Sequence, residues 1–182
     1  MISPAHGIIY KVLYSQACWL NKCQILELLV LKPIRIYADT SVFGGCFDDE
    51  FAKESRKLFN EIKDGRFILV VSPTTLRELE QAPLEVRQII AEIPDDCIEL
   101  MDFSEDIEHL RDAYIDAGVV GPSGLLDAEH IASATVARVD LIVSWNFKHI
   151  VHYERIRGYH AVNLLEGFHP IPIYSPWEVI EI

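Results

Sequence analysis

Three acidic side chains and one amide occupy places in the sequence from which they could act on one ligand: Asp39, Glu78, Asp127 and Asn146. Asp39 directly follows an apolar run, and Glu78 lies shortly after another such run. Oxygen ligands without a paired cysteine or histidine favour Mg²⁺ or Mn²⁺ over zinc. A cluster of such carboxylates repels itself unless a cation is present. The pattern therefore predicts a divalent-metal site, and such a site can activate a water molecule for hydrolysis.

The elements that must position these residues alternate between strands and helices. We expect a parallel α/β sheet, in which the carboxyl ends of the strands share one edge. A loop is expected around Gly44-Gly45, with Asp48-Asp49-Glu50 as cap and first-turn acids of the next helix. The predicted strands are 34–38, 66–71, 98–101, 141–144 and 171–174, and the predicted helices are 51–63, one starting at Ser72-Pro73, 84–92, 104–117, 125–139 and 153–165, before a closing tail at 176–182.

Each acid also has a simpler interpretation. Asp39 suits a turn or a helix cap, where aspartate is common. Glu78 could be a solvent-exposed helix residue that pairs with a neighbouring arginine such as Arg77. For Glu80, solvent exposure without a functional role is the favoured interpretation. Asp127 is harder to explain in this way, because the helix around it consists mainly of small and apolar residues. An acid on such a face is costly unless it is paired, hydrogen-bonded to a backbone N–H group or bound to a metal.

Four other side chains near these acids have two interpretations. His130 could orient a carboxylate or phosphate, although a satisfied, half-buried histidine is the more common case. Trp145 suits packing better than base stacking. Ser41 and Ser144 could orient the metal ligands or contact a phosphate.

Composition limits the classes of function. The chain has 182 residues, enough for one domain with a real core, and its net charge of −12 argues against a protein that coats nucleic acid. Bound cations can invert a local negative charge, so an enzyme acting on phosphate remains compatible, and a basic protein partner would suit the surface. Four cysteines without a CxxC pair predict a reduced, cytoplasmic protein. The apolar runs are too short to predict a transmembrane helix.

Residues 1–33 differ in composition from the rest of the chain. They contain a single acidic residue, and Pro33 separates them from the first expected strand. We therefore predict an N-terminal extension over 1–33, with a helix around 18–31, and an α/β domain over 34–182.

Four segments of the chain resemble, in order, the motifs of PIN domains, the fold of VapC-type toxin ribonucleases. The segments are 37–45 (YADTSVFGG), 72–83 (SPTTLRELEQAP), 127–134 (DAEHIASA) and 141–150 (LIVSWNFKHI). The resemblance covers residues 34 to 182. It implies a three-layer α/β/α sandwich with a central, mainly parallel sheet. It also implies a Mg²⁺- or Mn²⁺-dependent ribonuclease, often a homodimer and often inhibited by a small antitoxin.

The resemblance makes Asp39, Glu78 and Asp127 the metal ligands. Many PIN domains have a fourth acid where this chain has Asn146. An asparagine can offer a carbonyl oxygen or bond a metal-bound water, but it adds no charge, so a second metal would be held more weakly.

The expected reaction is hydrolysis of an RNA phosphodiester bond, with Glu78 or Asp127 accepting a proton from the attacking water. The main alternative is a PIN-like domain with weakened catalysis that acts as a protein-interaction or RNA-binding module. A haloacid-dehalogenase-like phosphatase with Asp39 as nucleophile is a third reading. Those enzymes usually have a second aspartate two residues later, where this chain has Ser41.

Overall fold

The computed structural model describes residues 33–180. The predicted extension over 1–33, including the helix expected around 18–31, lies outside these residues except for Pro33. Residues 34–180 belong to one compact unit. None of the helices in the described part has the length and apolar character that a membrane crossing requires.

The core of the fold is a five-stranded sheet in the order β3-β2-β1-β4-β5, with every neighbouring pair parallel. This confirms the predicted α/β class. The strands are β1 (Ile34–Ala38), β2 (Phe67–Val71), β3 (Ile98–Leu100), β4 (Leu141–Val143) and β5 (Ile173–Tyr174). Strands β2 and β3 are added one after the other on one side of β1, and the chain then returns to add β4 on the other side of β1. The strand order therefore reverses between the paired strands β1 and β4, and such a switch point is where open α/β sheets bind ligands.

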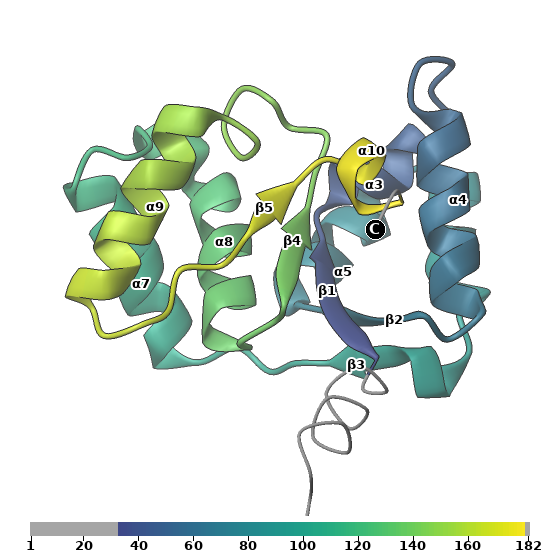
Figure 1. The fold of residues 1–182 in the computed structure, drawn as a ribbon, viewed down its shortest axis with the longest axis horizontal. Helices are drawn as coiled ribbons and strands as arrows, with labels where there is room; N and C mark the ends of the chain where they lie inside the picture. The colour runs from purple at the N-terminus through teal and green to yellow at the C-terminus, as the bar shows by residue number, and fades with distance from the viewer. Residues whose placement is uncertain (1–32, 181–182) are drawn as a thin grey trace, which may run out of the picture. The chain divides into compact units, whose positions relative to one another are not determined.

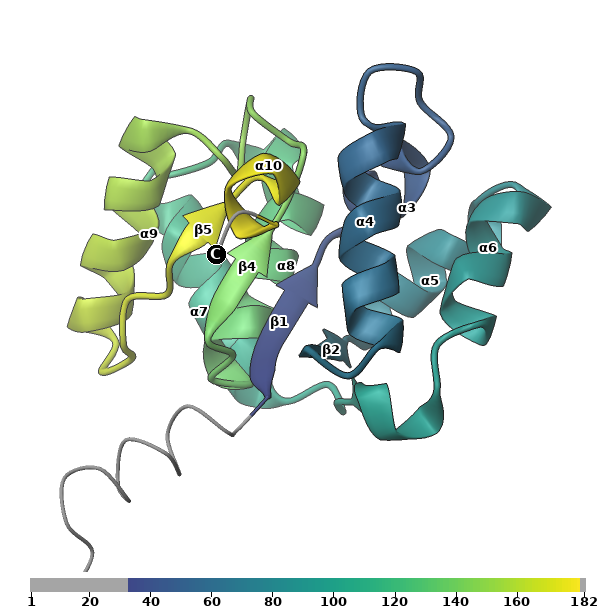
Figure 2. The same ribbon diagram turned by 45° about the vertical axis from the view of Figure 1, so that its right-hand side comes forward.

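Helices cover both faces of the sheet, which gives the three-layer α/β/α sandwich (Figure 1). They are α3 (Thr40–Gly45), α4 (Ala52–Lys63), α5 (Pro73–Gln81), α6 (Leu84–Ala91), α7 (Glu105–Asp116), α8 (Leu125–Val136), α9 (Tyr153–Leu165) and α10 (Pro176–Val179), with short 3₁₀ turns at Asp95–Cys97 and Pro122–Gly124. Figure 2 shows α3 to α6 on one side of β1 and α7 to α9 on the other.

Alternation along the strands explains the two layers. In β1, Ile36 and Ala38 pack into the apolar cluster beneath α3, α4 and α10. Tyr37, between them, packs into the opposite cluster with α7, α8 and α9. Because β1 and its neighbours are buried on both faces, their sequences are almost continuously apolar, as in other parallel sheets.

Several element boundaries differ from the sequence-based prediction. The expected glycine loop at 44–45 is the end of the short helix α3, and the closing tail contains α10. Helix α4 is preceded by Phe51 at its N-cap, so Asp48-Asp49-Glu50 do not cap it. Helix α8 ends at Val136 rather than 139, because Arg138 takes a left-handed conformation with φ of 52° and redirects the chain into β4.

Candidate functional site

Asp39 lies at the switch point of the sheet, immediately after β1. It occupies the N-cap position of α3, but its side chain makes no capping hydrogen bond. Its carboxylate instead accepts hydrogen bonds from Ser41 and, at 3.0 Å, from Ser144 at the end of β4. The side chain is only 4% exposed. Two serines therefore orient a buried carboxylate, which is the supporting role that the sequence suggested for Ser41 and Ser144.

Burial raises the pKa of Asp39 above its ordinary range, and the charge of Glu78 raises it further. The positive charge of His130 and the two serine hydrogen bonds act in the opposite direction but do not cancel the rise. Burial therefore outweighs the available positive charge at this carboxyl.

Glu78 reaches the same region from α5. Helix α5 begins with Ser72 as a true N-cap, whose hydroxyl accepts the Thr75 N–H, and Pro73 fills the first helical position. Glu78 lies later in this helix and accepts hydrogen bonds from Thr40 Oγ1 at 2.6 Å and from His130 Nε2 at 2.9 Å. Thr40 is the residue after Asp39, so this bond links the two acids. Pairing with Arg77 is therefore not what positions Glu78.

His130 is buried beneath this site, on α8. Burial lowers its pKa, but the Tyr37 hydroxyl and the carboxylates of Glu78 and Asp39 raise it to about 10. At neutral pH the ring is therefore an imidazolium. Its Nε2–H donates to Glu78, and its Nδ1–H donates to the Tyr37 hydroxyl at 2.7 Å. His130 is thus a buried histidine with partners at both ring nitrogens, the more common case named from the sequence, and one of these partners is the Glu78 carboxylate.

The charge on His130 has a consequence for its partner. Burial raises the pKa of Glu78, but the hydrogen bonds and charge of His130, with help from Thr40 and Arg77, bring that pKa below its ordinary value. Glu78 is therefore held as a carboxylate over a wide pH range.

Asp127 lies in the first turn of α8 and is half-buried. Its Oδ1 accepts a hydrogen bond from Asn146 Nδ2 at 2.8 Å. Burial raises the pKa of Asp127, and Glu78 adds to the rise, against the lowering effects of His149, His130 and Asn146. Glu78 thus raises the pKa of both aspartates, so the three acids form one electrostatically coupled group.

Asn146 positions Asp127 from the turn that follows β4. Its Oδ1 accepts the backbone N–H of His149 at 3.0 Å, which fixes the orientation of the amide. Its backbone N–H donates to the Ser144 hydroxyl, the same group that donates to Asp39. The amide of Asn146 therefore holds Asp127 through its NH₂ group, and the turn Ser144–Asn146 connects Asp39 with Asp127.

Trp145, in the middle of this turn, packs into the core. It is 6% exposed and stacks on Phe51, and its indole N–H donates to Ser55 at 2.8 Å. The close approach needs Gly45, where a Cβ atom would lie 2.7 Å from the indole nitrogen. The backbone N–H of Trp145 donates to the hydroxyl of Ser41, and that hydroxyl in turn donates to Asp39. The packing of Trp145 therefore also supports the position of Asp39. The packing interpretation of Trp145 is confirmed.

The donor set suits a hard divalent cation. Asp39, Glu78 and Asp127 supply only carboxylate oxygens, and a cation near them would relieve the raised pKa values of the two aspartates. Within residues 33–180, however, no three histidine, cysteine, aspartate or glutamate side chains already stand as a formed metal site. The chemistry of the donors therefore fits Mg²⁺ or Mn²⁺, while the side chains as they lie are engaged with serine, threonine, histidine and asparagine partners.

A second charged group next to the site was missed by sequence reasoning. Glu129 on α8 is 4% exposed and contacts Arg77, Thr74 and Arg111. Burial raises its pKa, but the Thr74 and Arg111 hydrogen bonds and the charges of both arginines lower it below the ordinary value. The signal was available, because Glu129 is an acid in the same helix of small and apolar residues that made Asp127 conspicuous.

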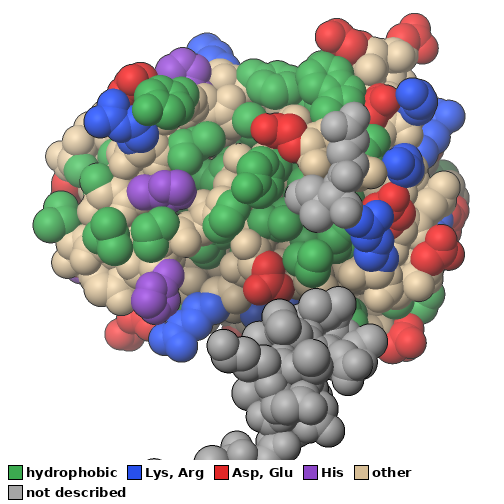
Figure 3. Space-filling view, in the orientation of Figure 1, with side chains coloured by type: hydrophobic (Ala, Val, Ile, Leu, Met, Phe, Trp, Pro, Cys, Tyr) green, Lys and Arg blue, Asp and Glu red, His purple; other side chains and the backbone are tan. Residues whose placement is uncertain are grey.

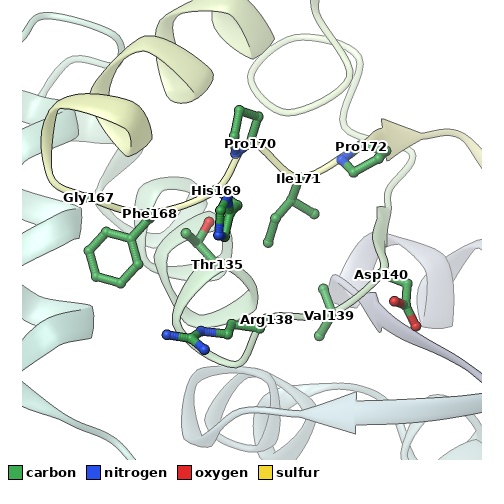
Figure 4. Close-up of a pocket in the computed structure, with 10 residues that line it drawn as sticks. All are labelled: Thr135, Arg138, Val139, Asp140, Gly167, Phe168, His169, Pro170, Ile171 and Pro172. Atoms are coloured by element: carbon green, nitrogen blue, oxygen red, sulfur yellow. The ribbon is translucent and has the colours of Figure 1, made fainter. Parts of the chain in front are cut away.

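Two surface features lie away from the acids. A cavity of about 300 Å³ is found at the amino ends of β4 and β5, the edge of the sheet opposite Asp39 (Figure 4). None of the four predicted site residues lines this cavity. Figure 3 shows hydrophobic side chains gathered over β5 and α10. On α10 and in the turn after β4, the half-exposed rings of Trp177 and Phe147 stack at a centroid distance of 6.0 Å.

No family model matches this chain, and no curated protein matches its sequence. The resemblance to PIN domains therefore stays a prediction from the four motifs.

Proposed function

We propose that this protein is a divalent-metal-dependent endoribonuclease of the PIN type that hydrolyses RNA phosphodiester bonds. The observation that carries the proposal is the connection of Asp39 and Asp127 through the Ser144–Asn146 turn, with Glu78 coupled to both. Three carboxylates at the switch point of a parallel sheet form a concentration of negative charge that a stable fold does not need. A role in binding a cation explains it.

The residues of this group would divide the work. Asp39, Glu78 and Asp127 would hold Mg²⁺ or Mn²⁺, which when bound supplies an acidified water and positive charge beside the phosphate. Ser41 and Ser144 keep the Asp39 carboxylate in one orientation. His130 and Thr40 do the same for Glu78. Orientation of this kind lowers the cost of assembling the reacting groups.

The two candidates for proton acceptor differ in the metal-free protein. Glu78 is held by His130 and has a lowered pKa, whereas burial raises the pKa of Asp127. A bound cation lowers the pKa of every carboxylate that holds it, so this difference does not rank the two acids in the metal-loaded enzyme. Glu78 or Asp127 takes the proton of the attacking water.

The alternative is a PIN-like domain with weakened catalysis that binds RNA or protein. Asn146 favours it, because a neutral amide stands where a fourth acid is expected and is already used to hold Asp127. We retain as parts of the main proposal the role of toxin, a small antitoxin partner, a homodimer and a cytoplasmic location. These follow from the family resemblance alone.

The decisive experiment compares RNA cleavage by the purified protein with and without EDTA, and with Mg²⁺ or Mn²⁺ restored. Wild type should cleave only with the metal, and Asp39→Ala should abolish cleavage while circular dichroism and melting show a folded protein. Glu80→Gln is the matched control, since Glu80 is an exposed acid on the same helix as Glu78. Cleavage by Asp39→Ala equal to wild type would refute the assignment. Metal-free RNA binding without any cleavage would favour the alternative.

A further inference from the structure

The surface beside Glu78 contains a pocket of about 450 Å³, lined by Thr74, Arg77, Glu78, Gln81 and Leu126. It joins helix α5 to the start of α8, so it opens directly next to the coupled acids. Pockets of this size accommodate small ligands. Arg77 is the only cationic side chain in its lining, in a protein whose net charge is −12.

Arg77 is exposed but its orientation is fixed. Its side chain is 60% exposed, and its Nη2 group donates both to Glu129 and, at 3.1 Å, to Thr74. No hydrogen bond to another described residue involves its Nη1 or Nε groups, which leaves these donors available at the pocket. An exposed arginine on a helix normally keeps its rotamer freedom, which costs free energy to lose on binding. Here that cost has already been met in the folded protein.

The anchor that fixes Arg77 is itself built from buried groups. The Glu129 side chain is 6% exposed and is also held by Arg111, whose side chain is 14% exposed. Arg111 forms further ion pairs with Glu108 and Asp112, so its own charge is compensated. Arg77 is the member of this network that faces solvent with unused donors.

We infer that this pocket seats one nucleotide of a single-stranded RNA next to the bond that is cleaved, with Arg77 binding its phosphate. The free Nη1 and Nε groups can each donate a charge-assisted hydrogen bond to a phosphate oxygen. Leu126, which is 50% exposed, offers an apolar surface to a base, and the Gln81 amide offers hydrogen bonds to a base edge. An unpaired base can reach such contacts, whereas a base inside a duplex cannot. This inference rests on the proposed function and names the substrate class of that same site.

The test uses the full-length protein and a short fluorescein-labelled single-stranded RNA. Binding is followed by fluorescence anisotropy in EDTA, so that it does not depend on catalysis. Arg77→Gln should weaken binding by about tenfold or more, and it should reduce the slope of log K against log salt concentration by about 0.7, the value for one lost phosphate contact on a single strand. Arg77→Lys should recover part of the affinity and most of the salt slope.

Two further variants guard the interpretation. Arg87→Gln is the matched control, because Arg87 is an exposed arginine on the neighbouring helix α6 and lines no part of this pocket. It should bind like wild type. Leu126→Asp adds a negative charge to the pocket at an exposed position, so it should weaken binding even if Arg77→Gln proves unstable.

The outcomes separate this inference from the proposed function. If wild type cleaves RNA with metal but Arg77→Gln and Leu126→Asp bind and cleave like Arg87→Gln, the pocket is not the nucleotide site while the nuclease assignment stands. If neither wild type nor any variant cleaves RNA, but Arg77→Gln and Leu126→Asp lose the RNA binding that wild type shows, the nuclease proposal fails and the nucleotide pocket stands. In an active enzyme, an increase in KM with little change in kcat for Arg77→Gln supports a substrate-binding role, and equal melting temperatures exclude a merely structural one.

Discussion

Asp127 and Glu129 lie two residues apart on α8, and their surroundings have opposite electrostatic effects. Asp127 receives its hydrogen bond from a neutral amide, and burial and the charge of Glu78 raise its pKa. Glu129 is in contact with two arginines and a threonine, which bring its pKa below the ordinary value despite burial.

The comparison separates two uses of a buried acid. Glu129 has positive partners within the fold, so it behaves as part of the structure. For Asp127, as for Asp39, burial and the charge of Glu78 outweigh the lowering effects of histidine charge and of the hydrogen-bond donors, so the fold bears a cost there that an external cation could relieve. A buried acid with a raised pKa in a shared cluster is therefore the better indicator of a functional site.

The largest expected effect comes from Asp127→Asn. This change keeps the size of the side chain and an oxygen that can accept the Asn146 hydrogen bond, but it removes the negative charge that would hold the metal or accept a proton. We expect kcat for RNA cleavage to fall by about 100-fold or more. Without metal, the free energy of unfolding should stay the same or rise, because the substitution removes a negative charge that burial makes unfavourable. Steady-state cleavage assays and urea denaturation in EDTA measure the two effects.

A stable Asp127→Asn protein with unchanged kcat would contradict the contrast between the two acids, since Asp127 would then be no more functional than Glu129. A marked loss of stability in Asp127→Asn would equally contradict the view that its charge is unfavourable in the fold.

A smaller effect, of the opposite kind, is expected for Glu129→Gln. Loss of this charge leaves the nearly buried Arg111 and the exposed Arg77 without their shared partner. The free energy of unfolding should fall by about 2 kcal/mol, the scale of a buried hydrogen bond to a charged group. Urea denaturation measures it, with Glu80→Gln as the surface control, for which a change within about 0.5 kcal/mol is expected. A Glu129→Gln protein as stable as this control would show that the arginine network contributes nothing.

The finest test is the pH dependence of these two stability differences in EDTA. The folded pKa of Glu129 lies below its unfolded value, so its contribution is present above the unfolded pKa and is lost as pH falls through the folded pKa. The deficit of Glu129→Gln should therefore shrink on acidification. The folded pKa of Asp127 lies above its unfolded value, so wild type loses stability as pH rises between the two values.

Asp127→Asn lacks that loss and should gain on wild type over the same interval. Urea midpoints measured from about pH 3 to about pH 7 cover both windows, given the ordinary carboxyl values. Two differences that change with pH in the same direction would contradict the assignment of opposite environments.

The positions of the acids in the fold were predictable because they depend on local patterns. Apolar runs ended by Asp39 and Ser144 identify two strand ends, and Ser72-Pro73 identifies the start of the helix that carries Glu78. Parallel connection then brings these ends to one edge. The short helix α3 was not predictable in this way, since its two glycines normally indicate a loop. Contacts of β1, α4 and Trp145 with this segment override that preference.

The electrostatic roles were less predictable, because they depend on partners far away in the sequence. Glu129 acquires its structural role from Arg77, 52 residues earlier, and from Arg111, 18 residues earlier. The imidazolium of His130 depends on Tyr37, 93 residues earlier, and on Glu78. Sequence patterns indicate that these side chains are polar residues in apolar surroundings, but only the packed helices determine which charges meet.

The pairing of β1 with β4 also affects when the site is formed during synthesis. Asp39 and its partner Ser144 are 105 residues apart, and Asp127 is held by Asn146 just beyond β4. Domains of this kind gain their long-range contacts late, after the intervening chain has been made. A nascent chain that ends before β4 lacks both connections, so the acids are not assembled on it. An RNA-cleaving enzyme with this order of strands would stay inactive while most of its own message is still being translated.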